Sequence, residues 1–306
     1  MLIRKYTSQL VEDDKNIDQI LYYDDGSKLL PFTHLTSSLN TQRFDIVFHT
    51  YPRYRLALMT WLARIPTRVG TGYRWYSFFF NKKVYAHRKT AERHELEYNL
   101  ALLEMMGIPF TAEDITPRID VPVQLRDRMQ GLVQSLGIKD GEKIVILHPG
   151  SGGSARDWNP VHFGELALKL EQIAGVRVII TGGRNEDRIV GVAKSAAGHA
   201  AVMLVGKLDL REYAALARMA KVFVSNSTGT IHIASAVGTP VIGLYPQITA
   251  LSAKRWGPYT DKKTIFVPAG RRVDCNICLS PKSSPCECMD TITVDSVYTA
   301  ALKYLD

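Results

Sequence analysis

The chain has 306 residues, of which 46% are hydrophobic and 22% are charged, a balance typical of a globular protein with room for two domains. The first residues lack the apolar core of about 7–15 residues that a secretory signal needs. No apolar run approaches the ~18 residues that indicate a membrane span. These features argue against a secreted or membrane-spanning protein, and we expect a cytoplasmic one.

The formal net charge of +8 is concentrated in residues 51–90, where there is no Asp or Glu. Aromatic residues alternate with the basic ones, and a field of one sign attracts a polyanion such as nucleic acid, an anionic membrane surface or a phosphorylated lipid. The alternative is a solvated basic face without a partner. The nine basic residues of this stretch are Arg53, Arg55, Arg64, Arg68, Arg74, Lys82, Lys83, Arg88 and Lys89.

Predicted strands and helices alternate along the first half of the chain. The second predicted helix ends before Gly107, a residue type common just after a helix C-terminus. A proline-containing linker then leads to a helix at 123–136. The predicted strands are Leu2–Tyr6, Ile17–Tyr23, Asp45–His49 and Arg68–Gly70, and the predicted helices are Leu56–Ala63 and Ala91–Met106.

In the second half the strands are continuous apolar runs, as in a parallel sheet covered by helices on both faces. We therefore predict an α/β fold of two doubly wound, Rossmann-like domains with a cleft between them, residues 1–140 and 141–306. The last helix, 294–305, is expected to pack back on the fold. The other predicted elements are strands at Lys143–Leu147, Val176–Ile180, Val222–Val224 and Val241–Leu244, and helices at Val161–Ile173, Asp187–Ala197, Leu210–Met219 and Ile231–Val237.

Ligands of such sheets lie beyond the carboxyl ends of the strands, so the loops that follow the strands are candidate binding elements. The loop 148–160 has three glycines, which let the backbone approach a ligand, and the hydroxyls of Ser151 and Ser154. Arg156 adds a permanent planar cation suited to phosphate oxygens. The loop lacks the Gly-Lys-Ser/Thr of a Walker A motif and the Gly-x-Gly-x-x-Gly of a dinucleotide site, which disfavours a hydride-transfer cofactor.

Two further loops join a strand to a helix in the same way. Glu186, at the end of the loop 181–186, is placed to accept hydrogen bonds from a ribose, unless it only caps the helix. The loop 226–229 precedes a helix, where free backbone N–H groups and the helix dipole attract an anion such as a diphosphate; an ordinary N-cap is the alternative. His232 lies one helical turn after Thr228, so both can face one ligand. Three such loops favour a nucleotide-diphosphate site.

Three motifs occur together in these loops: His148-Pro-Gly with Arg156-x-Trp158, Gly182-Gly-x-x-Glu186, and Asn226-Ser-Thr-Gly-x-x-His232 with Pro240. In this combination the chain resembles glycosyltransferase family 9, typified by the ADP-heptose:lipopolysaccharide heptosyltransferases. The resemblance covers the second half well and the helix near 92–107 more loosely. The resemblance implies a GT-B type enzyme that transfers a sugar with inversion and without a metal. The sugar donor that it implies first is ADP-heptose, from which heptose is transferred. The implied acceptor is a lipopolysaccharide core or similar anionic glycolipid at the inner membrane face.

The resemblance also implies a donor site in the C-terminal domain. Arg156 stands where the family usually has Lys and would neutralise charge as the diphosphate leaves, while Glu186 would contact the nucleoside. Ser227 replaces the Asp that many members carry, which removes a like charge from near the phosphates. The implied donor-binding residues are Ser151, Gly152, Arg156, Glu186, Ser227, Thr228, Gly229 and His232.

The N-terminal domain would hold the acceptor, and here the chain departs from the family's pattern. The family carries an acidic base near its first strand, whereas this chain opens on what resembles the second strand, so we expect the first strand–helix unit and the base to be absent. That expectation leaves open a non-catalytic nucleotide-sugar-binding relative. A polyanion or nucleic-acid-binding protein ranks last, because no nucleic-acid-binding motif accompanies the basic stretch. The implied acceptor-binding residues are Arg53, Arg74, Lys82, Lys83 and Arg88.

The four cysteines form one cluster, Cys275-x-x-Cys278 and Cys286-x-Cys288. In a cytoplasmic chain such a cluster favours zinc over disulfides, although Cys-x-Cys is less usual for zinc. Structural zinc, reduced thiols and disulfides remain the alternatives. Asp24-Asp25 indicates a turn rather than the Asp-x-Asp of metal-dependent glycosyltransferases, so we expect no catalytic metal and no required cofactor.

Overall fold

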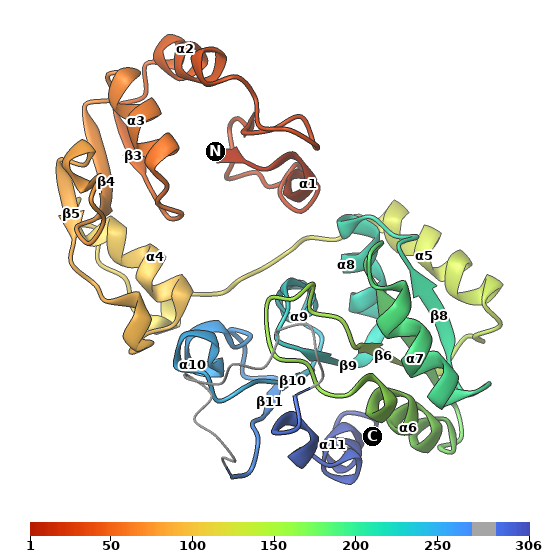
Figure 1. Cartoon of the computed structure of the whole chain (residues 1–306). Coiled ribbons are helices and arrows are strands. Elements are labelled where there is room, and N and C mark those ends of the chain that lie inside the picture. The colour runs from red at the N-terminus through yellow and green to blue at the C-terminus, as the bar shows by residue number, and fades with distance from the viewer. Residues whose placement is uncertain (271–285) are drawn as a thin grey trace. The chain divides into compact units, whose positions relative to one another are not determined.

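The computed structural model describes residues 1–270 and 286–306, which divide into two compact units, Met1–Ile115 and Thr116–Asp306 (Figure 1). Helix α5 (Val123–Ser135), which the sequence analysis placed before its boundary at 140, packs on α8 (Leu210–Met219) within the second unit. Both units consist of parallel strands joined by helices, which confirms the predicted α/β class. Among the described residues, no helix is long and apolar enough to cross a membrane.

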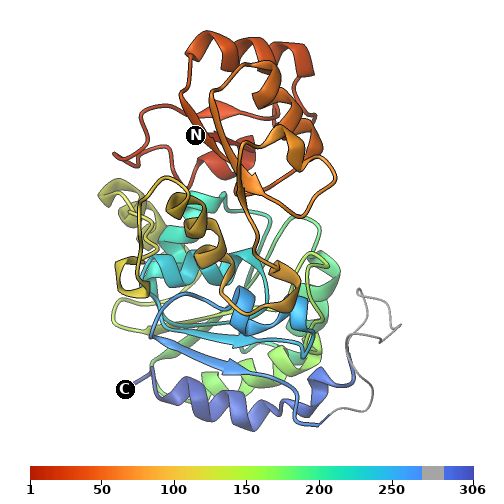
Figure 2. The same ribbon diagram turned by 90° about the vertical axis from the view of Figure 1, so that its left-hand side faces the viewer.

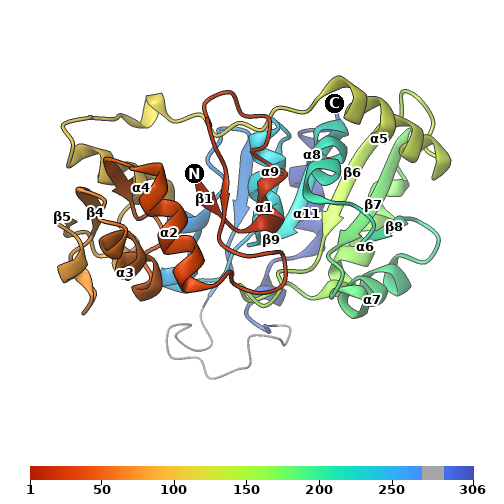
Figure 3. The same ribbon diagram turned by 90° about the horizontal axis from the view of Figure 1, so that it is seen from above.

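A parallel sheet of six strands forms the centre of the second unit (Figure 3). Numbered along the chain from β6, its strands lie in the order 3-2-1-4-5-6, which is the Rossmann order. The order reverses between β6 and β9, and ligands of such sheets lie at that switch point. The strands are β6 (Lys143–His148), β7 (Val176–Gly182), β8 (Val202–Val205), β9 (Ala220–Asn226), β10 (Val241–Leu244) and β11 (Lys263–Phe266).

Both faces of this sheet are covered. Val145 and Leu147 of β6 share one core cluster with side chains of α6, α7 and α11, and Ile146, which points to the other face, is also fully buried. Helix α11 packs on α6 and β10, both within the second unit. The remaining helices of this unit are α6 (Pro160–Glu171), α7 (Asp187–Ala197), α9 (Gly229–Ala236), α10 (Ala253–Trp256) and α11 (Val294–Leu302).

The first unit contains a three-stranded parallel sheet, β3-β4-β5, and a separate parallel pair, β1-β2 (Figure 2). Its largest core cluster joins α2 to α3 through Leu35, Leu39 and Met59. The elements are β1 (Leu2–Ile3), α1 (Lys5–Ser8), β2 (Leu21–Tyr22), α2 (Phe32–Gln42), β3 (Ile46–Phe48), α3 (Tyr54–Leu62), β4 (Thr67–Thr71), β5 (Lys82–Val84) and α4 (Glu95–Glu104).

The predicted elements agree best in the second unit, where α7, α8 and β10 begin and end at the predicted residues. In the first unit the strand predicted at 2–6 ends at Ile3, and the one predicted at 17–23 is a strand only at its end. Helix α2 was not predicted, because its Thr, Ser and Asn residues have low helix propensity. The short edge strands β5, β8 and β11 were also missed.

Candidate active site

The three loops predicted to bind a ligand lie at the carboxyl end of the six-stranded sheet. They follow β6, β7 and β9, and β6 is hydrogen-bonded to both of the other strands. The loops bring Ser151, Gly152, Glu186 and Thr228 to one pocket of about 360 Å³, which we call the donor pocket. Its other lining residues are His148, Gly182, Gly183, Arg184, Asn185, Gly206, Leu208, Asp209, Leu210, Tyr213 and Thr230.

Glu186 joins the first loop to the second. Its Oε1 accepts a hydrogen bond from the backbone N–H of Gly152 (3.0 Å), and its Oε2 accepts one from Gly183 (2.7 Å). The carboxyl group also lies over Gly150, where a Cβ atom would come within 2.2 Å of it. A side chain at position 150 would therefore displace the Glu186 carboxylate, which is held by two fixed donors at the rim of the donor pocket.

Asn226 joins the first loop to the third. Its side chain is fully buried, donates from Nδ2 to the carbonyl of Pro149 (2.7 Å) and accepts at Oδ1 from the N–H of Trp158 (2.9 Å). The sequence analysis gave Asn226 only a place in an anion-binding loop and missed this role. The available signal was an amide side chain at the end of an otherwise apolar strand, because a buried amide needs partners.

A buried polar cluster lies under the donor pocket. His148 Nδ1 lies 2.9 Å from Thr181 Oγ1 and 3.1 Å from the Tyr213 hydroxyl, and the two hydroxyls are 3.0 Å apart. Burial lowers the pKa of His148, and the Glu186 carboxylate, 3.5 Å from its Nε2, opposes that shift. Burial raises the pKa of Tyr213. The cluster is therefore uncharged at neutral pH, and it fixes β6, β7 and α8 relative to one another.

Two hydroxyls belong to residues that line the donor pocket. Ser151 Oγ lies beside the Asp157 carboxyl and Thr230 Oγ1 beside the Tyr213 hydroxyl, and each lowers the pKa of that neighbour, although both contacts fall outside ideal hydrogen-bonding geometry. Thr228 is the N-cap of α9, and its side chain makes no capping hydrogen bond. Free donors at a helix N-terminus suit an anionic ligand, and anion binding at this loop stays a prediction.

The remaining predicted donor residues lie in the same loops but do not line the donor pocket. The Arg156 side chain is only 6% exposed. Gly229 is the first residue of α9, and His232 is half-buried one turn further along that helix. The carbonyl of Ser227 lies 3.2 Å from Ser154 Oγ, a second link between the first and third loops.

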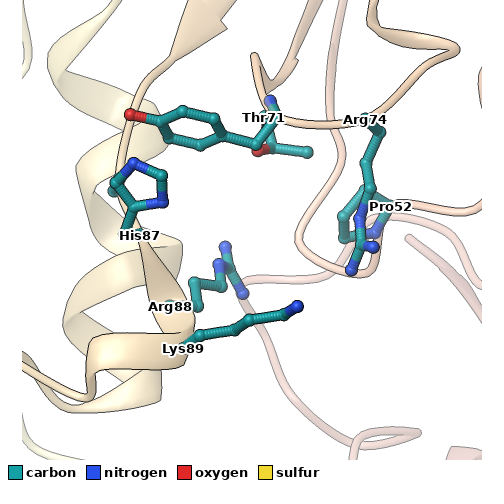
Figure 4. Close-up of a pocket in the computed structure, with 8 residues that line it drawn as sticks. Pro52, Thr71, Arg74, His87, Arg88 and Lys89 are labelled. Atoms are coloured by element: carbon teal, nitrogen blue, oxygen red, sulfur yellow. Dashed lines mark hydrogen bonds between the residues drawn. The ribbon is translucent and has the colours of Figure 1, made fainter.

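A second pocket, of about 310 Å³, lies in the first unit and is strongly basic; we call it the basic pocket (Figure 4). Arg74 lies on one side of it, and the side chains of Arg88 and Lys89 extend toward it from the other side. Tyr73 and His87 stack at its edge with ring centroids 3.9 Å apart. The other lining residues are Pro52, Thr71 and Ala86.

The basic pocket brings together two of the five predicted acceptor-binding residues, Arg74 and Arg88. Arg88 also pairs with Glu95 of α4. Arg53 packs over the ring of Tyr51 (4.4 Å to the centroid). Lys82 and Lys83 lie on β5 and do not line the pocket. Lys89, which the sequence analysis counted in the basic stretch but did not assign to the acceptor, does line it.

The predicted turn at Asp24-Asp25 is present. Asp25 Oδ1 accepts hydrogen bonds from the N–H groups of Ser27 and Lys28 (both 2.8 Å), and these bonds lower the pKa of Asp25 to about 2. Asp24 is buried and pairs with Arg4. Two cysteines of the predicted cluster, 286 and 288, are free thiols, while 275 and 278 lie outside the described residues, so the state of the cluster remains a prediction.

A comparison with protein-family models decides what kind of protein this is. The model for glycosyltransferase family 9 (heptosyltransferase) matches residues 32–282, most of the chain. The chain belongs to this family. It is therefore a glycosyltransferase of the heptosyltransferase type, as the resemblance implied.

Individual relatives agree with this assignment. A putative glycosyltransferase of Haemophilus influenzae is 24% identical over 90% of this chain and 82% of its own length. Lipopolysaccharide heptosyltransferase 3 of Escherichia coli is 28% identical over 74% of this chain and 65% of its own length.

Solved structures share the fold. A family 9 glycosyl transferase from Veillonella parvula has a TM-score of 0.81 at 20% identity, covering 99% of this chain and 87% of its own. The E. coli ADP-heptose LPS heptosyltransferase II has a TM-score of 0.77 at 20% identity, covering 99% and 88%. These likenesses confirm the predicted GT-B fold class.

Proposed function

We propose that this protein transfers a heptose from ADP-heptose, with inversion and without a catalytic metal or other cofactor, to a lipopolysaccharide core or a similar anionic glycolipid. The donor pocket at the switch point of the second sheet carries the proposal. The choice of donor is supported by fold relatives: the E. coli heptosyltransferase WaaC has been solved with ADP and with ADP-2-deoxy-2-fluoro heptose, each at a TM-score above 0.6.

In this proposal the diphosphate lies against the N-terminus of α9 and the loop after β6. Ser151 and Thr228 supply hydroxyls, and the backbone N–H groups at the start of α9 supply fixed donors. Glu186 faces the nucleoside from its position on the glycine amides. Donors fixed before the reaction stabilise the charge that develops on the departing diphosphate without a cost of reorganisation.

The transfer is a single displacement. A hydroxyl oxygen of the acceptor attacks the anomeric carbon while the bond from that carbon to the diphosphate oxygen breaks, and the hydroxyl proton passes to the departing diphosphate or to water, so ADP leaves and the configuration inverts. Arg156 is assigned to the leaving diphosphate. The basic pocket, with Arg74, Arg88 and Lys89, is assigned to an anionic group of the acceptor, because guanidinium groups bind phosphate and carboxylate oxygens in pairs of hydrogen bonds.

Isothermal titration calorimetry with ADP and with UDP tests the donor site. We expect ADP to bind the wild type more tightly than UDP. Arg156→Ala should weaken ADP binding by about tenfold or more, since a charge-assisted hydrogen bond contributes about 1.5–3 kcal/mol. Lys221→Ala, an exposed cation at the opposite end of β9, is the control for the loss of one positive charge and should bind ADP as the wild type does. Because Arg156 is buried, a urea unfolding midpoint near that of the wild type must first show that Arg156→Ala is folded. If neither nucleotide binds the wild type, the donor site is misassigned.

A transfer assay with ADP-heptose and a de-acylated core oligosaccharide tests the acceptor. Arg74→Ala should raise the KM for the acceptor and leave ADP affinity unchanged, because Arg74 lies in the other unit from the donor pocket. Tight ADP binding with no transfer to any core acceptor would favour the non-catalytic relative instead.

A further inference from the structure

The first unit carries exposed apolar side chains that neither pocket uses. Five of them, which we call the aromatic surface, come from α3 and from the segment after β4, and each is between 43% and 72% exposed. We propose that the aromatic surface docks on the interface of an anionic lipid bilayer. The aromatic surface consists of Tyr54, Trp61, Leu62, Trp75 and Phe78.

The four aromatic side chains of the aromatic surface form one continuous group, and Leu62 follows Trp61 on α3. Tyr54 stacks on Trp75 with ring centroids 4.9 Å apart. Trp61 and Phe78 both contact the ring of buried Phe79, at 5.5 Å and 4.3 Å, and Tyr54 lies 6.1 Å from the same ring. Tyr54 and Trp61 also lie two turns apart on one face of α3. Phe79 therefore forms the buried base on which the group packs, and the other rings are exposed to solvent.

The charges around these rings suit an anionic partner. Residues 46–91 contain no Asp or Glu. The exposed cations Arg53, Arg64 and Arg74 each lie within two residues of a member of the aromatic surface. A bilayer with anionic lipids attracts each such cation by about 1 kcal/mol near the membrane surface. Trp and Tyr favour the headgroup level of a bilayer, because their rings are apolar and their N–H and O–H groups still find water.

The geometry of the aromatic surface favours docking on a membrane surface over spanning the membrane or binding a nucleic acid. Helix α3 has 9 residues, far fewer than the ~20 that a membrane span needs. Tyr54 and Trp75 stack on each other and so turn one face of each ring away from any base, whereas single-strand binding proteins offer free ring faces. An apolar group rimmed by cations matches the proteins that lie on a membrane surface.

This inference deepens the proposed function and rests on it in one respect: a glycolipid acceptor lies in a bilayer, and Arg74 of the basic pocket directly precedes Trp75 of the aromatic surface. Docking of the aromatic surface would bring the basic pocket close to the headgroups. The docking itself needs no acceptor, so it can be measured separately from transfer.

The test is co-sedimentation of the full chain with phosphatidylethanolamine–phosphatidylglycerol vesicles that contain no glycolipid. The double variant Trp75→Ser/Phe78→Ser should partition about tenfold or more weakly than the wild type. Tyr6→Ser/Ile108→Ser, which removes two apolar side chains of the same unit that are 61% and 51% exposed, is the matched control and should partition as the wild type does. A circular dichroism spectrum and a urea unfolding midpoint equal to those of the wild type show that both variants are folded.

Two further measurements sharpen the test. Lipids with brominated acyl chains should quench the fluorescence of wild-type protein, and part of this quenching should be lost in Trp75→Ser, with the remainder coming from Trp61. Arg64→Gln should weaken binding at low salt and reduce its salt dependence, because it removes one cation from the rim.

Three results would overturn the docking proposal: a wild type that does not bind the vesicles, a double variant that binds them as the wild type does, or a double variant that loses binding to a single-stranded oligonucleotide rather than to vesicles. Retained transfer to a de-acylated acceptor by the double variant supports docking as a role separate from catalysis. A wild type that binds vesicles but transfers no heptose counts against the proposed function alone.

Discussion

Single polar side chains hold the donor pocket together. Glu186 and Asn226 each hydrogen-bond to two backbone groups, and in doing so they join loops that are far apart in the sequence.

Asp157, in the first loop, destabilises the folded protein when its carboxyl group is ionised. Burial raises its pKa to about 6, the Ser151 hydroxyl partly opposes that shift, and the Glu186 carboxylate adds to it. The negative charge of ionised Asp157 therefore lowers the free energy of unfolding.

That effect predicts a dependence of stability on pH. Between about pH 4 and pH 6 the folded protein binds more protons at Asp157 than the unfolded chain does, so the free energy of unfolding should fall as the pH rises through this window. Asp157→Asn removes the effect. At pH 7 the variant should be more stable than the wild type by about 2 kcal/mol, and below about pH 4 the difference should disappear.

Urea unfolding of both proteins at pH 4 and pH 7 measures this difference. Asp187→Asn, which removes an exposed carboxylate from the second unit, is the control and should show a much smaller change. A stability difference for Asp157→Asn that is equal at the two pH values would mean that the titration of Asp157 is not its source.

At the scale of elements, the contact between α6 and α7 depends on one glycine. A Cβ atom at Gly164 would lie 2.4 Å from the carbonyl oxygen of Ala193 and 2.8 Å from the backbone nitrogen of Ala197. Backbone atoms cannot move aside as a flexible side chain can. The two helices therefore approach closely only because position 164 has no side chain.

Gly164→Ala should lower the free energy of unfolding by about 1–3 kcal/mol, since an added methyl group must push the two helices apart. Gly191 of α7 is the matched control, because a Cβ atom there meets nothing within 4 Å. Gly191→Ala should instead stabilise the protein by about 0.5–1 kcal/mol through its higher helix propensity. Thermal or urea unfolding checks both, and equal signs for the two variants would refute the argument.

Elements of the second unit could be predicted from the sequence because their apolar runs are fully buried. The runs of β6 and β9 are unbroken, that of β7 is interrupted only by Arg177, and the loops after them contain the glycines of a binding site. The edge strands β5 and β11 were missed because they carry polar residues, such as Lys263 and Thr264 of β11. Strand β8 is apolar but only four residues long. The roles of Asn226 and Glu186 depend on which loops lie next to each other in space. The order of the strands in the sheet determines this, and the spacing of residues along the chain does not.

At the scale of the whole molecule, the two pockets belong to different compact units. All residues of the donor pocket come from Thr116–Asp306, and all residues of the basic pocket come from Met1–Ile115. Binding of the donor should therefore stabilise the second unit more than the first unit. A ligand that binds only the folded state stabilises it by RT ln(1 + [L]/Kd), about 2.7 kcal/mol at a hundredfold excess over Kd.

Hydrogen exchange with and without saturating ADP tests this separation. We expect slower exchange at the backbone amides of loops 148–160, 181–187 and 226–232, and little change at α2 and α3 of the first unit. Protection of the same size in α2 and α3 would show that ADP binding couples directly to the first unit.

The links made by Asn226 and Glu186 have a consequence for engineering. Because each loop of the donor pocket is hydrogen-bonded to a backbone group of another, the three loops cannot be exchanged one at a time. A chimera that takes only its β9–α9 loop from a relative with a different sugar donor would keep the new side chains but disturb the old contacts. To change the donor specificity of this protein, all three loops should therefore be exchanged together, with the glycine at position 150 kept in the first of them.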